Sequence, residues 1–184
     1  MSRGSHPSSI VIGAIAALAL AGCPRLDDGN YVYLDDLEGP LCGGVPCGWT
    51  RVAGPEEGAR WAESLPGEHG LHLSGNGVVV RTNPGIELPF SMSDADLGLD
   101  LIARCDRGSS LVVEVGATQD FPVATVGLEP VLAIPTTWSD PRPSTLPPLG
   151  SMGLTLRAID SITIAKTGDG QCEVDWIGIV SRTF

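Results

Sequence analysis

Hydrophobic and polar residues alternate along much of the chain with a period of two, and the period of a helix is almost absent. The alternation is clearest in residues 97–105, 110–115, 151–157 and 172–180. Their inward faces are predicted to carry Leu97, Leu99, Leu101, Ala103 and Cys105; Leu111, Val113 and Val115; Met152, Leu154 and Leu156; and Cys172, Val174, Trp176 and Val180. This alternation predicts strands with one face on a core. Residues 106–109 (DRGS) predict a turn that joins the first two strands as a hairpin.

Shorter strands are predicted between turn signals in the rest of the chain. The candidate segments are residues 31–37, 49–53, 70–74, 77–81, 86–90 and 160–165, separated by turns such as GNG at 75–77, NPG at 83–85 and GDG at 168–170. Residues 135–149 hold five of the 15 prolines and predict a long ordered loop. About ten short strands at this spacing predict an all-β fold, an antiparallel β-sandwich, without a repeat or a second domain.

Residues 10–20 (IVIGAIAALAL) depart from this pattern, because they carry no charge and no hydrogen-bonding side chain. They follow a polar segment that contains Arg3 and His6. Eleven helical residues rise about 16 Å, which is too short for the ~30 Å hydrocarbon core of a bilayer. The run also lacks the amphipathic period of a helix on a globular core. A positive start, a short apolar run and small residues behind it are typical of a secretory signal peptide.

The next residues, LAGC at 20–23, resemble the lipobox of bacterial lipoproteins. The resemblance implies that Cys23 is linked to diacylglycerol, becomes the first residue of the mature protein and anchors it to a membrane. Residues 24–30 (PRLDDGN) suit a short polar tether. We therefore expect a signal peptide at 1–22, a lipidated tether at 23–30 and a single domain at 31–184. Pro24 stands where an inner-membrane retention signal often has aspartate, which favours the outer membrane.

Charge narrows the possible partners. Without residues 1–22 the chain has 162 residues, and its ten basic and 22 acidic side chains give a net charge of −12. Such a surface repels phosphate backbones, which disfavours nucleic-acid binding. Polybasic segments are absent from the sequence, so we expect membrane contact through the lipid anchor.

With Cys23 lipidated, four cysteines remain in an exported chain: Cys42, Cys47, Cys105 and Cys172. They predict two disulfides, for which three pairings are possible. The tight turn CGGVPC favours Cys42–Cys47, which leaves Cys105 to pair with Cys172 on the inward faces of two predicted strands. A zinc site is the less suitable alternative, because Cys105 and Cys172 lack a close second ligand pair.

Four motifs in order, LEG at 37–39, GW at 48–49, PGEHGLHLSGNG at 66–77 and EVDWIGI at 173–179, resemble the galactose-binding-like β-jelly roll of many carbohydrate-binding modules. The resemblance spans about residues 31–182 and implies a jelly-roll sandwich with a carbohydrate ligand. Glu38 and Asp175 match acidic residues that bind a structural Ca²⁺ in many members, and further candidates nearby are Asp35, Asp36 and Glu173. Two features depart from the family pattern: the Cys42–Cys47 turn is an insertion, and Trp176 replaces a second aspartate. The alternative for Asp175 is an orientation toward solvent.

Sugar binding in such modules uses exposed aromatic rings and planar polar side chains. Trp138 in the proline-rich loop, with Arg142 nearby, is the favoured ligand-binding position, and Trp61 is a second candidate. The alternative is that Trp138 seals the end of the sandwich. Trp49 and Trp176 stand at strand positions and are expected in the core.

Catalytic motifs are absent from the sequence. His69 and His72 do not share a helix face, His72 is expected on the solvent side, and Lys166 is expected to be solvated. We therefore expect a lipid-anchored, non-catalytic binding module of the cell envelope with a carbohydrate ligand. One alternative is a structural or protein-interaction lipoprotein of the envelope, and another is a hydrolase with unrecognised carboxylates.

Overall fold

The computed structural model describes residues 31–65, 68–137 and 146–182. These residues form β-strands, turns and loops and no helix, so none of their segments has the length and apolar character of a membrane-crossing helix. The strands are β1 (Tyr31–Asp35), β2 (Leu41–Cys42), β3 (Val45–Pro46), β4 (Trp49–Ala53), β5 (Ala59–Leu65), β6 (Glu68–Ser74), β7 (Val78–Thr82), β8 (Ile86–Ser93), β9 (Leu97–Cys105), β10 (Ser110–Gln119), β11 (Ala124–Leu128), β12 (Thr155–Thr167) and β13 (Gln171–Ser181).

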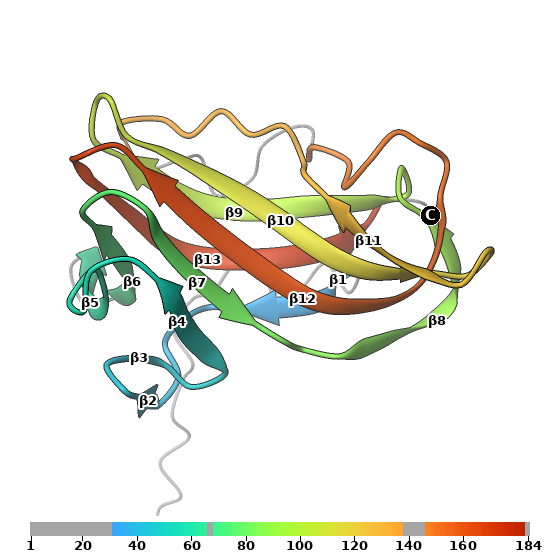
Figure 1. Cartoon of the computed structure of the whole chain (residues 1–184), viewed down its shortest axis with the longest axis horizontal. Coiled ribbons are helices and arrows are strands. Elements are labelled where there is room, and N and C mark those ends of the chain that lie inside the picture. The colour runs from blue at the N-terminus through green and yellow to red at the C-terminus, as the bar shows by residue number, and fades with distance from the viewer. Residues whose placement is uncertain (1–30, 66–67, 138–145, 183–184) are drawn as a thin grey trace, which may run out of the picture.

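Two antiparallel sheets are built around the two longest strands (Figure 1). In the five-stranded sheet, β13 has β9 on one side and β6 and β1 end to end on the other, and β5 pairs with β6. In the six-stranded sheet, β12 has β10 on one side and β7 and β8 on the other, with β11 and β4 at the edges. Strands β2 and β3 form a separate small hairpin. The predicted antiparallel β-sandwich is confirmed.

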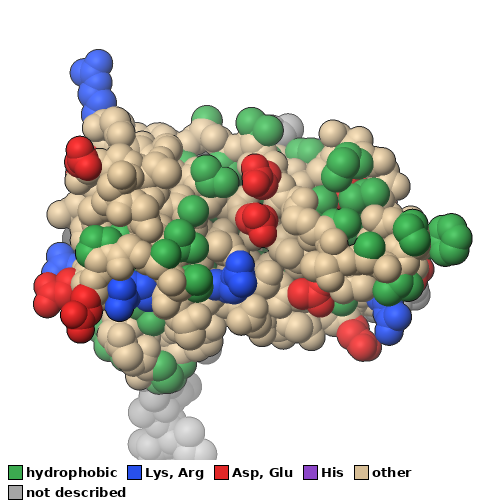
Figure 2. Space-filling model, viewed as in Figure 1, with side chains coloured by type: hydrophobic (Ala, Val, Ile, Leu, Met, Phe, Trp, Pro, Cys, Tyr) green, Lys and Arg blue, Asp and Glu red, His purple; other side chains and the backbone are tan. Residues whose placement is uncertain are grey.

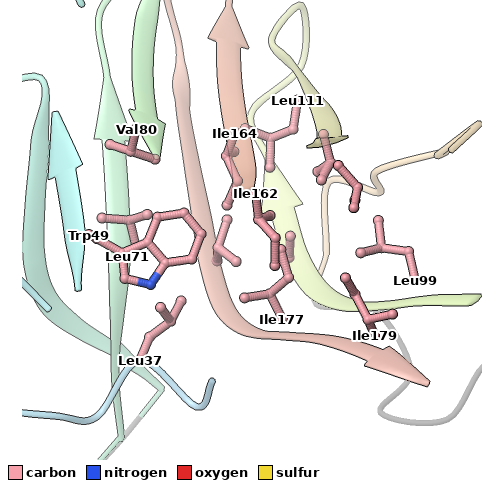
Figure 3. Packing of buried hydrophobic residues seen from close by; sticks show 14 of the residues in the cluster. Leu37, Trp49, Leu71, Val80, Leu99, Leu111, Ile162, Ile164, Ile177 and Ile179 are labelled. Carbon is pink, nitrogen blue, oxygen red and sulfur yellow. The ribbon is translucent and has the colours of Figure 1, made fainter. Parts of the chain in front are cut away.

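The inward faces of the two sheets form one apolar core (Figure 3). Leu71, Leu99, Ile177 and Ile179 of the five-stranded sheet belong to the same cluster as Val80, Leu111, Ile162 and Ile164 of the six-stranded sheet. Trp49 is buried in this cluster, as predicted, and its indole N–H donates to an Asp35 carboxylate oxygen at 2.8 Å. A buried tryptophan N–H needs such a partner.

The predicted hairpin between residues 97–105 and 110–115 is wrong. β9 pairs with β13, whereas β10 pairs with β11 and β12 in the other sheet. The turn itself is present, since the Ser109 N–H donates to the Asp106 carbonyl at 3.0 Å, but it crosses from one sheet to the other. Both strands direct apolar side chains into one core. Alternation therefore does not distinguish neighbours in one sheet from strands that face each other.

Three predicted inward positions, Met152, Trp176 and Val180, are also corrected. β12 begins at Thr155, so Met152 precedes the strand and is exposed. In β13 a bulge between Val174 and Trp176 changes the face of the residues that follow. Trp176 and Val180 are buried, but they lie on the outer face of the sheet and outside the core cluster, and Ile177 and Ile179 take the inward positions.

Both predicted disulfides are present. Cys42–Cys47 closes the β2–β3 hairpin, and Cys105–Cys172 joins directly opposed residues of β9 and β13. The second bridge is buried in the core cluster. The predicted inward orientation of Cys105 and Cys172 is thus confirmed.

Lys166 near the end of β12 is buried, which corrects the expectation that it is solvated. Its ammonium group donates to the carbonyl oxygens of Gly75 at 2.7 Å and Gly168 at 2.5 Å. These carbonyls belong to the turns before β7 and after β12, so one buried charge holds two neighbouring turns together. A lysine before a polar turn gives no sequence signal of that enclosure.

Candidate functional site

Four polar side chains line up across the outer face of the five-stranded sheet. Strands β5, β6, β13 and β9 each contribute one, because Arg60 is paired with His72, His72 with Glu173, and Glu173 with Arg104. We call Arg60, His72, Glu173 and Arg104 the charged row. Neighbouring strands lie about 4.8 Å apart, so the row spans roughly 15 Å.

Glu173 organises the row from its centre. One carboxylate oxygen lies 3.2 Å from His72 Nδ1, and the other accepts a short hydrogen bond from Arg104 Nε. The second ring nitrogen of His72, Nε2, lies 3.1 Å from the Glu63 carbonyl oxygen. His72 and Glu173 each keep only 11% of the side chain exposed, whereas Arg104 keeps 40%. The two enclosed groups therefore orient a guanidinium that faces solvent.

The protonation of the row follows from its burial and charges. Burial is the largest cause that lowers the pKa of His72, and the positive charges of Arg60 and Arg104 act in the same direction. The carboxylate of Glu173 and the carbonyl of Glu63 oppose this shift. The hydrogen bond to Glu173 raises the pKa of Arg104. At neutral pH the row therefore presents a neutral imidazole between two guanidinium groups.

A small hollow of about 170 Å³ opens beside the row. Arg104 and Glu173 form one wall, and Asp106, Thr136 and Gln171 form the others. The segment that carries Thr136 is tied to the edge of β9, because the Cys105 N–H donates to the Pro135 carbonyl at 2.9 Å. A polar hollow of this kind suits hydroxyl groups better than an apolar ligand.

A larger cavity of about 450 Å³ lies between the β2–β3 hairpin, β4 and β5. Its lining includes Cys42 of the disulfide, Thr50, Arg51 and Glu56, with Trp49 below them. Arg51 Nη1 donates to the carbonyl oxygens of Gly54 at 2.9 Å and Pro55 at 3.0 Å. The volume lies within the range of small-molecule pockets, which makes this cavity a second candidate.

Trp61 and Glu38, two of the predicted site residues, both contact His69. The Trp61 ring stacks on the His69 imidazole, with centroids 3.9 Å apart and planes at 9°, and the indole N–H donates to the Leu37 carbonyl at 3.1 Å. Glu38 accepts the His69 backbone N–H at 2.5 Å, and its second oxygen lies 3.7 Å from His69 Nδ1. The predicted sugar-binding Trp61 is thus half-buried, with His69 covering one ring face.

Asp175, the second predicted calcium ligand, lies in the bulge of β13. It accepts the Ser64 hydroxyl at 2.9 Å and is half-buried. Gly70 permits this arrangement, since a Cβ there would meet the Val174 carbonyl oxygen at 2.6 Å. The partners of Asp175 and Glu38 differ, and within the described ranges no group of three His, Cys, Asp or Glu side chains is placed to hold a metal. A calcium site at Glu38 and Asp175 stays a prediction.

Three other predicted positions, Cys23, Trp138 and Arg142, lie outside the described residues. The sequence singled out neither Arg60 nor Arg104, and it treated Glu173 only as a further calcium candidate. Alternation gives His72, Arg104 and Glu173 polar positions opposite the core, whereas residues 59–65, which contain Arg60, were not predicted as a strand. Their alignment depends on strand register, which sequence alone does not supply.

No protein-family model matches the chain, and no curated protein matches it in sequence. Solved structures with similar folds include BiXyn10A CBM1 in its apo form, with a TM-score of 0.48, 10% identity, and coverage of 82% of this chain and 98% of that one. Another is TmCBM61 in complex with β-1,4-galactotriose, with a TM-score of 0.41, 12% identity, and coverage of 73% and 89%. A third is the family 11 carbohydrate-binding module from Clostridium thermocellum with a β-1,3-1,4-mixed-linked tetrasaccharide, with a TM-score of 0.39, 17% identity, and coverage of 80% and 93%.

Proposed function

We propose that the chain is a lipid-anchored, non-catalytic binding module of the bacterial envelope, and that its ligand is a carbohydrate lying across the charged row. The observation that carries this proposal is the alignment of four hydrogen-bonding side chains from four adjacent strands. A guanidinium group can bind two neighbouring oxygen atoms with fixed geometry. Neighbouring strands lie about 4.8 Å apart, so the four side chains can reach hydroxyl groups spread along an extended sugar chain.

The contacts of Glu173 support a binding role for the row. One carboxylate oxygen accepts a hydrogen bond from Arg104, and the other lies 3.2 Å from a ring nitrogen of His72. This arrangement prepares Arg104 for a ligand, because an oriented side chain loses less conformational freedom when it binds. In this proposal Glu173 is a positioning residue, and Arg60 and Arg104 touch the sugar.

The anchor and the location rest on residues 1–30. The signal-like segment followed by LAGC supports export and lipidation at Cys23. Two disulfides suit an oxidising compartment. We place the mature chain on the outer membrane, with the seven residues between Cys23 and Tyr31 as its tether.

The test is a binding screen on immobilised polysaccharides, followed by calorimetry on the best ligand. Arg60→Ala and Arg104→Ala should each weaken binding by about tenfold or more, which corresponds to one lost charge-assisted hydrogen bond. Arg51→Ala is the matched control, because Arg51 is exposed and lines the other cavity. Trp138→Ala and Arg142→Ala test the two loop positions predicted from the sequence.

The outcomes separate the candidate sites. Loss of affinity in Arg51→Ala alone would indicate that the ligand binds in the cavity beside the β2–β3 hairpin. Loss of affinity in Trp138→Ala alone would indicate that the ligand binds at the loop that contains Trp138. A parent chain that binds no glycan would refute the carbohydrate ligand and favour an envelope protein as the partner.

A further inference from the structure

The turn between β10 and β11 presents apolar side chains to solvent. Phe121 is 88% exposed and Val123 69% exposed, and Pro122 between them is also exposed. Met152, which is 67% exposed, lies at the same end of the sandwich, because the Asp120 N–H donates to the carbonyl of nearby Thr155 at 2.8 Å. We call Phe121, Val123 and Met152 the apolar tip. Figure 2 shows hydrophobic side chains projecting at the right edge, where Figure 1 places this turn.

Polar contacts below the turn hold it in place. The Gln119 side-chain amide donates to the Phe121 carbonyl at 2.8 Å, and the Ser91 hydroxyl donates to an Asp120 carboxylate oxygen at 2.8 Å. The apolar side chains therefore point outward on an ordered hairpin. Single exposed apolar residues are ordinary on protein surfaces, but a cluster at a projecting end indicates an interaction surface.

The apolar tip lies at the end of the sandwich where the described domain begins. Tyr31 pairs with Val180 near the end of β13, and Ser181 there pairs with Leu97. The Leu97 carbonyl accepts the Leu149 N–H at 2.9 Å, and residue 149 leads directly into the segment of Met152. The eight Cα steps from Cys23 to Tyr31 span at most about 28 Å. A lipid on Cys23 would hold this end of the domain close to the bilayer.

We propose that the apolar tip inserts into the lipid surface that holds Cys23 and forms a second membrane contact. The inference rests on the lipid anchor proposed above, and it does not depend on the identity of the sugar. It also fixes an orientation. Glu173 and Ser181 are eight residues apart on β13, roughly 26 Å, so an inserted tip directs the charged row away from the bilayer.

Depth-dependent fluorescence quenching tests the insertion. The full chain is extracted from bacterial membranes and reconstituted in phosphatidylcholine vesicles with or without brominated acyl chains. A zwitterionic lipid is used because the chain is strongly acidic. Brominated lipid should reduce the fluorescence added by Phe121→Trp by about half or more, since interfacial side chains reach the acyl boundary. The control is Val52→Trp. Val52 is 55% exposed and lies on β4, and β4 pairs with β7 beside the end of β12 that is remote from the apolar tip.

Mass spectrometry and detergent-phase partition of the same chain report the anchor separately. A lipidated chain with quenching at position 121 and none at position 52 supports the inference. A lipidated chain without quenching at 121, or with equal quenching at both positions, overturns the inference and leaves the anchor intact. If the chain is a dimer in detergent, Phe121→Ser converts it to a monomer, and position 121 shows no quenching, then the apolar tip binds a second copy of the chain and the inference is overturned. A chain without lipid refutes the anchor, and the inference falls with it.

Discussion

Removing the Cys105–Cys172 disulfide should destabilise the fold far more than removing Cys42–Cys47. The first bridge joins residues 67 positions apart, and the second joins residues five apart. A disulfide stabilises mainly by restricting the unfolded chain, and the effect grows with the logarithm of the closed loop. For these separations the chain-entropy relation gives about 4 kcal/mol for Cys105–Cys172 and about 2 kcal/mol for Cys42–Cys47.

Urea unfolding of two double variants, Cys105→Ala/Cys172→Ala and Cys42→Ala/Cys47→Ala, measures the difference. For a domain of this size the first variant should unfold at about 2 M less urea than the parent, and the second at about 1 M less. The reduced parent chain is the control for side-chain volume, because its thiols still fill the space around the buried Cys105 and Cys172. It should lose about as much stability as the two variants together. Equal losses in the two variants would refute this reasoning, as would a loss below about 1 kcal/mol for Cys105–Cys172.

Three further predictions concern charge and metal. Burial lowers the pKa of His72 below its ordinary 6.5, so the folded protein binds fewer protons than the unfolded chain as the pH falls through 6.5, and it loses stability there. His72→Gln should therefore flatten the pH dependence of the free energy of unfolding, measured by urea, between about pH 7 and 5. Parallel curves for the parent and the variant would contradict this prediction. Lys166→Met leaves the Gly75 and Gly168 carbonyls without this donor and should cost about 1–3 kcal/mol, whereas Arg157→Met at an exposed position should change the unfolding free energy by less than about 0.5 kcal/mol. If Glu38 and Asp175 bind calcium, a chelator should lower the midpoint of thermal unfolding, and Asp175→Asn should abolish that shift; an unchanged midpoint in the parent would remove the site.

The sequence predicted individual strands well where one face alternates and clear turns bound it. Residues 49–53 and 97–105 form strands with the predicted bounds. Residues 59–65 were missed, because Ala62 and Glu63 interrupt the alternation, and residues 124–128 were missed although Ala124, Val126 and Leu128 do alternate with Thr125 and Gly127. The sheet to which residues 110–115 belong was also predicted wrongly. A period of two indicates which face of a strand is buried, but it does not indicate which strand pairs with it.

The candidate site was harder to predict than the fold, because it depends on register. Arg60 and Arg104 are 44 positions apart in sequence, yet β6 and β13 bring them into one row. Aromatic residues gave a stronger sequence signal, and Trp61 was chosen on that basis. Its stacking on His69 and its bond to Leu37 depend on the loop after β1, where Leu37 has a φ of 58° that its neighbours in sequence do not indicate.

The bulge in β13 gives the outer face of the five-stranded sheet two distinct halves. Before the bulge, that face carries Glu173 and the rest of the charged row. After it, the face carries Trp176, whose ring meets Tyr31 edge-on at 6.0 Å.

Without the extra residue the period of two would continue unchanged through the strand. Trp176 and Val180 would then enter the core, and Ile177 and Ile179 would face outward. Gly70 leaves space for the bulge, because a Cβ atom at this position would collide with the Val174 carbonyl oxygen. The aromatic half lies toward the end that carries the apolar tip, and the polar half lies away from it. One irregular residue in the last strand therefore separates the surface proposed to bind sugar from the end proposed to meet the membrane.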